Sequence, residues 1–223
     1  MYRILLTLIT SFTLSIVSPI LQASDFESAE PELQGYGAFS QLNKDWMLLA
    51  LYGKEENELS MATPHRLEIK IVTEKFSQRR FRQLWLEALA VEHGPEKMAL
   101  MQTELDQFFN ILQGPLKQGD ALIIERNEIN GLAVTNVTLN YHDLAQLSNG
   151  FLDSIVQSLI GKHPPTQMLK SGLMGNESVR HQMDLAIRFD RLEPTLPRIA
   201  EISRWGKRAM VRHNIIASKI NGA

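Results

Sequence analysis

The sequence predicts an α+β fold with a mainly antiparallel sheet, and two observations support this class. Early in the chain, apolar residues recur at every second position, which is the period of a strand. They then recur three and four positions apart, which is the period of a helix, and this change from strand to helix happens twice. Runs of strands followed by runs of helices are typical of α+β folds. The 223-residue chain is 44% hydrophobic and 22% charged, an ordinary globular composition that can bury a core without disulfide bonds.

The first 23 residues have the layout of a secretory signal peptide. Arg3 precedes an apolar run over residues 4–17, a Ser-Pro break follows, and Ala23 is a small residue at a suitable cleavage point. The run is shorter than the ~20 residues that a membrane-spanning helix needs. An uncleaved membrane anchor is the alternative, because Leu21 is a poor residue two places before the cleavage point. We therefore expect export, with the bacterial periplasm as the location.

Three strands are predicted to open the domain. Residues 24–32 form a polar leader, and residues 33–54 then predict two strands joined by Asn43-Lys44-Asp45. Gly35-Tyr36-Gly37 in the first strand indicates a bulge or a close approach of the backbone to a neighbour. Residues 65–73 alternate apolar and charged side chains, which predicts a third strand with one solvent-exposed face.

A change of period after the third strand predicts two helices. Ser77 is a suitable N-cap, and apolar residues then recur at three and four up to a break at His93-Gly94-Pro95. A second helix is expected from about Glu96 to Gly114-Pro115.

Two more strands and another helix complete the predicted domain. The strands, residues 121–126 and 132–141, surround Asn130-Gly131, which is a strong hairpin signal. The helix covers residues 151–160 and stops at Gly161, whose place after the last apolar residue is typical of a C-terminal cap.

Charge is distributed unevenly along the chain. Residues 24–175 carry 13 Lys and Arg against 20 Asp and Glu, whereas residues 176–223 carry 9 against 5. An acidic body argues against nucleic-acid binding. The tail is predicted to hold two helices separated around Pro194 and Pro197, the second being a basic amphipathic helix over residues 198–220. That helix suits a membrane surface or a protein partner, or it folds onto the acidic body of its own chain.

The sequence predicts no metal site and no cofactor. The sequence contains no cysteine, which excludes catalysis by a thiol and metal sites with thiolate ligands. No phosphate-binding loop and no nucleophile elbow occurs. None of the six histidines has the spacing of a metal-binding pair; they are His65, His93, His142, His163, His181 and His213.

Three segments together resemble the chalcone isomerase-like family over residues 33–175. Residues 35–54 carry Gly-x-Gly and then a strand that ends in Leu-Tyr, and residues 81–126 are similar to the bacterial exported branch, with a helix pair, a Gly-Asp turn and a strand. The clearest match is residues 151–175, where a helix ends at Ile160-Gly161, a Pro-containing corner follows, and a short helix ends in leucines. The resemblance implies a sheet packed on one face by a helical layer, with a cleft between them.

The resemblance also implies which residues line this cleft. Phe39 stands where the catalytic arginine of the family is expected, and Met47 stands where its threonine is expected. His93 falls near the family's tyrosine, Ser158 near a further hydroxyl residue, and Tyr36 within Gly-x-Gly. A guanidinium stabilises developing negative charge and a phenyl ring cannot. The expected lining is therefore apolar, which argues against isomerase activity.

Three functions follow as hypotheses. The favoured one is an exported protein without isomerase activity that binds an apolar small molecule between sheet and helices; alternatively, Phe39 and Met47 simply fill the cleft. An isomerase or lyase-type enzyme would use His93 as the base, with Ser158 or Tyr36 assisting. A scaffold would dock on a membrane or a protein partner through its basic helix.

Overall fold

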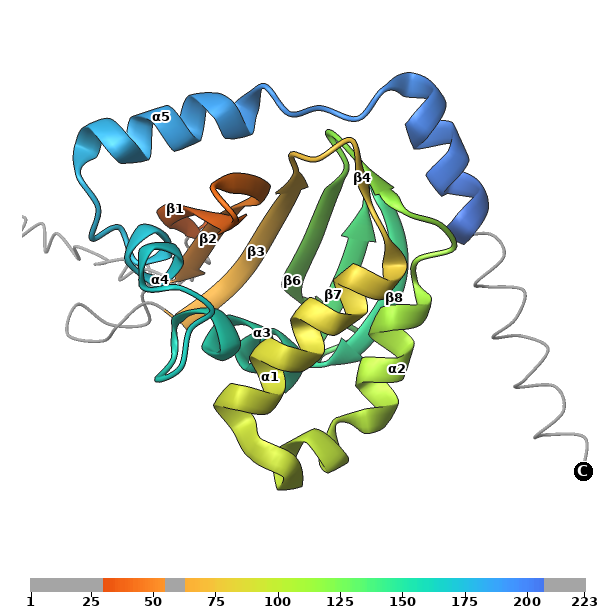
Figure 1. The fold of residues 1–223 in the computed structure, drawn as a ribbon. Helices are drawn as coiled ribbons and strands as arrows, with labels where there is room; N and C mark the ends of the chain where they lie inside the picture. The colour runs from red at the N-terminus through yellow and green to blue at the C-terminus, as the bar shows by residue number, and fades with distance from the viewer. Residues whose placement is uncertain (1–29, 55–62, 207–223) are drawn as a thin grey trace, which may run out of the picture.

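The structure, a computed structural model, describes residues 30–54 and 63–206 and is built on a six-stranded sheet (Figure 1). The strands lie in the order β1-β2-β3-β6-β7-β8, and every neighbouring pair is antiparallel. They are β1 (Glu32–Gln41), β2 (Lys44–Lys54), β3 (Thr63–Ile71), β6 (Ala121–Ile129), β7 (Leu132–Leu139) and β8 (His142–Ser148). A small separate sheet pairs β4 (Lys75–Phe76) with β5 (Leu116–Lys117). The predicted signal peptide at residues 1–23 lies outside the described residues, and so do residues 207–220 of the predicted basic helix.

Two-residue turns set the register of the sheet. The predicted turn at Asn130-Gly131 is confirmed, with φ of 54° and 76°, the left-handed values that such hairpins require. The β1–β2 turn uses Leu42-Asn43, which also have positive φ. It therefore begins one residue earlier than the predicted connection, because Lys44 already pairs with Gln41.

Strand β8 was not predicted from the sequence. It follows a third turn, at Asn140-Tyr141, with φ of 47° and 70°. Its sequence HDLAQLS does not alternate regularly, and only Leu147 in it is buried. The pairing of β7 with β8 also shifts its register between Val137 and Thr138 of β7, which further interrupts the alternation of side chains.

One face of the sheet carries the predicted layer of helices, which confirms the fold class (Figure 1). The layer consists of α1 (Gln78–Leu100), α2 (Gln102–Asn110), α3 (Gly150–Ile160) and α4 (Gln167–Leu173). Helix α1 bends at the predicted break, because Gly94 has a φ of 73° and Pro95 follows it. The core lies between sheet and helices and includes Leu49, Ile69, Ile124, Val137, Trp85 and Ile155.

Glycines allow α4 to pack directly on β1. A Cβ atom on Gly172 of α4 would lie 2.5 Å from the carbonyl oxygen of Tyr36, and Gly35 faces the backbone of Gly172 in turn. Gly37 faces the leucine side chains of α4. The close approach predicted for Gly-x-Gly is therefore confirmed, and a register shift between Leu33 and Gly35 adds the predicted bulge.

The opposite face of the sheet is covered near its β1 edge by α5 (Val179–Asp190) (Figure 1). Leu185 and Phe189 of this helix form a second small core with Leu48 and Ala50 of β2. The first part of the tail thus packs on the body of its own chain.

Gln182 fastens α5 to the edge strand β1. Its side-chain Oε1 accepts a hydrogen bond from the backbone N–H of Tyr36 at 2.8 Å. Its Nε2 donates to the carbonyl oxygen of Tyr36 at 3.1 Å and to that of Gly172 at 2.9 Å. One side-chain amide therefore joins α5, β1 and α4.

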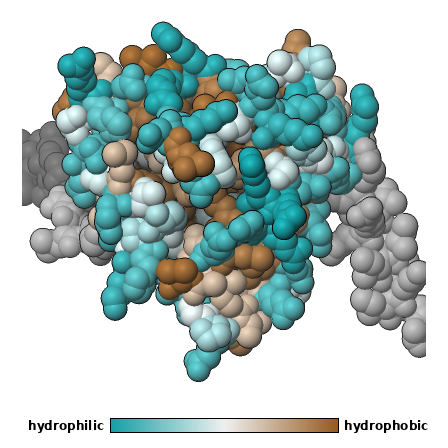
Figure 2. All heavy atoms as spheres, in the orientation of Figure 1, coloured by the Kyte–Doolittle hydropathy of each residue, from teal (hydrophilic) through white to brown (hydrophobic). Residues whose placement is uncertain are grey.

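Residues 196–206 form a further helix that also packs on the body. Ile202 and Trp205 belong to the main core, and Arg198 is buried. The apolar side of residues 198–206 thus packs against the body of the same chain. For this part of the basic helix, the structure shows the alternative in which the helix folds onto its own chain. Among the described residues, no helix combines the length and the apolar character needed to cross a membrane. The surface in Figure 2 is mainly hydrophilic, with apolar side chains in small separate groups.

Candidate functional site

A pocket of about 360 Å³ opens where the end of the β1–β2 hairpin meets α1 and the corner between α3 and α4. Its lining includes Phe39, Trp46, Leu84, Ala88, Pro164 and Pro165. This volume lies at the lower end of the ~300–1,000 Å³ typical of ligand pockets, so it suits a compact molecule.

Aromatic rings form the sheet side of the pocket. Phe39 is 6% exposed, and its ring meets that of Trp46 edge-on at a centroid distance of 6.2 Å. Trp46 in turn packs edge-on against Phe76 at 5.7 Å. Because such edge-to-face contacts fix ring orientation, this wall is preformed.

Glu92 holds the Pro-containing corner in place. Its carboxylate accepts hydrogen bonds from the backbone N–H groups of Lys162 at 3.0 Å and His163 at 2.7 Å. Burial alone would raise the pKa of Glu92, but these two bonds and the nearby His163 and His93 lower it below its usual value. The carboxylate therefore acts as a cap for the chain that leaves α3.

Gly161 confirms the predicted end of α3, for a steric reason. Its φ is −70°, which is outside the left-handed region. A Cβ atom at this position would collide with the Glu92 carboxylate and with the carbonyl oxygen of Gln157. Glycine is thus required by the approach of the capping carboxylate.

The polar part of the pocket lining carries charges of both signs, with Arg80 and Glu87. The Arg80 guanidinium lies over the Trp46 ring, 5.1 Å from its centroid. Arg80 and Trp46 also line a second groove, of about 750 Å³, beside the pocket. The Arg80–Trp46 pair therefore forms the boundary between the two hollows.

Of the five predicted cleft residues, the structure places only Phe39 in the pocket lining. Met47 is fully buried on the same face, in the main core. Tyr36 faces the opposite side of the sheet, where its ring packs 5.3 Å from that of Phe189. Burial raises the pKa of Tyr36, together with the charges of Tyr52, Asp190 and Glu68, so its hydroxyl stays protonated at neutral pH.

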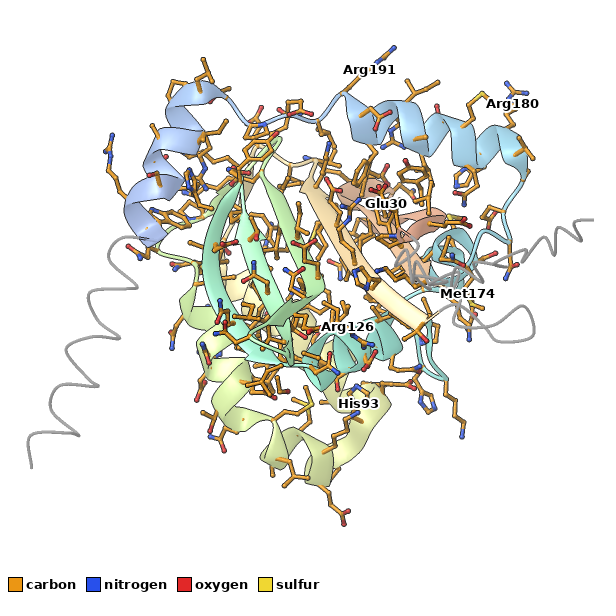
Figure 3. All side chains as sticks on the ribbon, turned by 180° about the vertical axis from the view of Figure 1, so that it is seen from behind. Glu30, His93, Arg126, Met174, Arg180 and Arg191 are labelled. Carbon is orange, nitrogen blue, oxygen red and sulfur yellow. The ribbon has the colours of Figure 1, made fainter. Side chains whose placement is uncertain are left out.

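His93 lies beside α3 and Ser158 belongs to it, and both side chains are hydrogen-bonded to backbone carbonyls of that helix. His93 lies at the bend of α1 (Figure 3). Its Nε2 atom is 2.8 Å from the carbonyl oxygen of Ser154. The Ser158 hydroxyl is fully buried and donates to the carbonyl oxygen of Ile155 at 2.7 Å. The two side chains thus engage different partners and do not form a base and nucleophile pair.

Trp46, Arg80 and His163 line the pocket but were not among the predicted site residues. The N-cap at Ser77 places Arg80 in the first turn of α1, but this local signal does not say which part of the molecule that turn packs against. The described residues contain no cluster of three or more histidine or acidic side chains that could hold a metal ion.

A model of the chalcone isomerase-like family matches residues 20–175, more than half of the chain. The chain therefore belongs to the chalcone isomerase-like family. No match was found among curated protein sequences. Among solved structures, the chain is similar to a fatty-acid binding protein of Arabidopsis thaliana, with 16% sequence identity, a TM-score of 0.48, and coverage of 70% of this chain and 90% of that one.

Proposed function

We propose that this protein binds a compact apolar molecule in the pocket between β1, α1 and the corner, and that it does not catalyse isomerisation. The observation that carries the proposal is the position of Phe39. It is a wall of the pocket, at the place where the sequence resemblance puts the catalytic arginine. A phenyl ring contributes apolar contact area there and no charge stabilisation.

The surroundings of the other polar candidates support binding over catalysis. His93 and Ser158 direct their hydrogen bonds to backbone carbonyls of α3, and neither lines the pocket. A general base has to reach the proton that it removes, and these two groups are engaged elsewhere.

We propose further that the protein acts after export to the bacterial periplasm, as a member of the exported branch of its family. The support is the signal-peptide layout of residues 1–23. Fractionation of the source cells, followed by N-terminal sequencing of the isolated protein, tests this. A periplasmic protein that begins near residue 24 is expected, and a cytoplasmic protein that retains Met1 or Tyr2 contradicts it.

Native mass spectrometry of gently purified protein tests the binding proposal. The wild-type protein is expected to carry a bound small molecule that survives desalting. Ala88→Phe fills the pocket from α1 and should remove the bound mass, because Ala88 lines the pocket. Ala90→Phe is the matched control, since Ala90 is on the same helix but exposed to solvent.

The thermal unfolding of both variants is measured in parallel to show that they are folded. A wild-type protein that is always empty and binds no apolar compound would overturn the proposal. So would a bound mass that is equally abundant in folded Ala88→Phe protein.

A further inference from the structure

The groove beside the pocket is rich in cationic side chains. Among the described residues, Lys44, Lys75 and Arg80 line it, and Glu74 is the single acidic one. This local excess of positive charge contrasts with the acidic composition of residues 24–175, which carry 20 Asp and Glu against 13 Lys and Arg. Such a local field attracts anions.

These three cationic groups have no carboxylate partner among the described residues. Within that part of the chain, ion pairs bind several other arginines, including Arg82 to Asp106 and Arg126 to Asp153. No such pair involves Lys44, Lys75 or Arg80. Their charge is therefore available to a ligand.

Arg80 is positioned where the apolar and the charged surfaces meet. It lines both the pocket and the groove, and stacking on Trp46 orients its guanidinium. A guanidinium offers a planar set of N–H donors that matches a carboxylate. On the pocket side, Phe39 and Trp46 present aromatic surface to a compact ligand.

We infer that the pocket takes an anionic amphiphile, whose apolar and preferably aromatic body lies against Phe39 and Trp46 and whose carboxylate contacts Arg80. This inference rests on the proposed function, because it requires a ligand in that pocket. Lys44 and Lys75 add long-range attraction for the anion, which salt weakens.

A matched pair of probes tests the inference by isothermal titration calorimetry. The probes are 4-butylbenzoate and 4-butylbenzyl alcohol, which share their apolar body and differ in charge. Wild-type protein is expected to bind the benzoate about tenfold more tightly than the alcohol, because hydrogen bonds to charged groups are stronger than neutral ones.

Two substitutions in the same helical turn separate the role of Arg80 from a general effect of charge. Arg80→Gln should lower the affinity for the benzoate about tenfold and change that for the alcohol much less, so the preference is lost. Arg79→Gln removes the same charge from an exposed position outside both linings and should preserve the preference.

The two ways of failing are distinguishable. Equal affinity of the wild-type protein for both probes, or an unchanged preference in Arg80→Gln protein, overturns the inference while the proposed function stands. Absence of binding of either probe, together with an empty protein in native mass spectrometry, overturns the proposed function and the inference with it.

Discussion

Arg198 and Asp120 form a buried, two-pronged ion pair that joins the C-terminal tail to the turn before β6. The Nε atom of Arg198 is 3.0 Å from Oδ1 of Asp120, and its Nη2 atom is 2.6 Å from Oδ2. The side chains are 4% and 0% exposed. Asp120 also accepts hydrogen bonds from the Lys117 backbone N–H and the Asn140 amide, so its charge is fully compensated.

Removing one partner of this pair should destabilise the protein strongly. Arg198→Met leaves the Asp120 carboxylate buried without its counter-charge, for which we expect a loss of about 3–5 kcal/mol in the free energy of unfolding. Urea unfolding measures it. Arg204→Met is the control, because Arg204 is an exposed residue of the same helix. Equal effects of the two substitutions would show that the ion pair does not stabilise the fold.

Gly172→Ala should weaken the contact between α4 and β1. The added methyl group meets the carbonyl oxygen of Tyr36, a backbone atom that can move only with its strand. We expect a loss of roughly 2 kcal/mol, as for other overpacked sites. Gly150→Ala is the matched control. Gly150 is the first residue of α3, and an added Cβ atom there would meet no atom within 4 Å, so alanine should be neutral or stabilising. Similar stability of both variants would contradict this account of the packing.

The stability supplied by Glu92 should depend on pH. Because its pKa is lowered in the folded state, its contribution is present above the pKa of an unfolded glutamate, about 4.3, and is lost as the pH falls through the folded value. Glu92→Gln should therefore unfold more easily than the wild type by about 1 kcal/mol at pH 7. The difference should shrink below about pH 4.

Thermal unfolding of both proteins between pH 3 and pH 7 checks this expectation. Glu87→Gln is the control, because Glu87 is an exposed residue of the same helix. A difference between wild type and Glu92→Gln that is constant over the whole range would rule out the capping carboxylate as its source.

Features determined by short-range chemistry could be predicted from the sequence. The bend at Gly94-Pro95 and the hairpin turn at Asn130-Gly131 each depend on two residues with restricted or unusual backbone preferences. The end of α3 at Gly161 could also be predicted, but glycine is required there by the long-range approach of the Glu92 carboxylate. Strand β8 has no such signal, because it is stabilised by pairing with β7 and carries little apolar alternation.

The candidate site was harder to predict, because its walls meet only in the tertiary structure. Arg80 and Trp46 are distant in sequence and come together through the packing of α1 on the β1–β2 hairpin. Tyr36 is different, since a signal for its placement was present. It is three residues from Phe39 in one strand, and an odd spacing places two side chains on opposite faces of a sheet.

The double contact between Gln182 and Tyr36 has a consequence for how separate molecules meet. An edge strand with free N–H and C=O groups is a template on which a strand of another molecule can add, which is a common start of aggregation. At Tyr36 both groups are already bonded to the Gln182 amide, and α5 covers the strand beside them. Growth of the sheet from one molecule into the next is thereby blocked at the centre of β1.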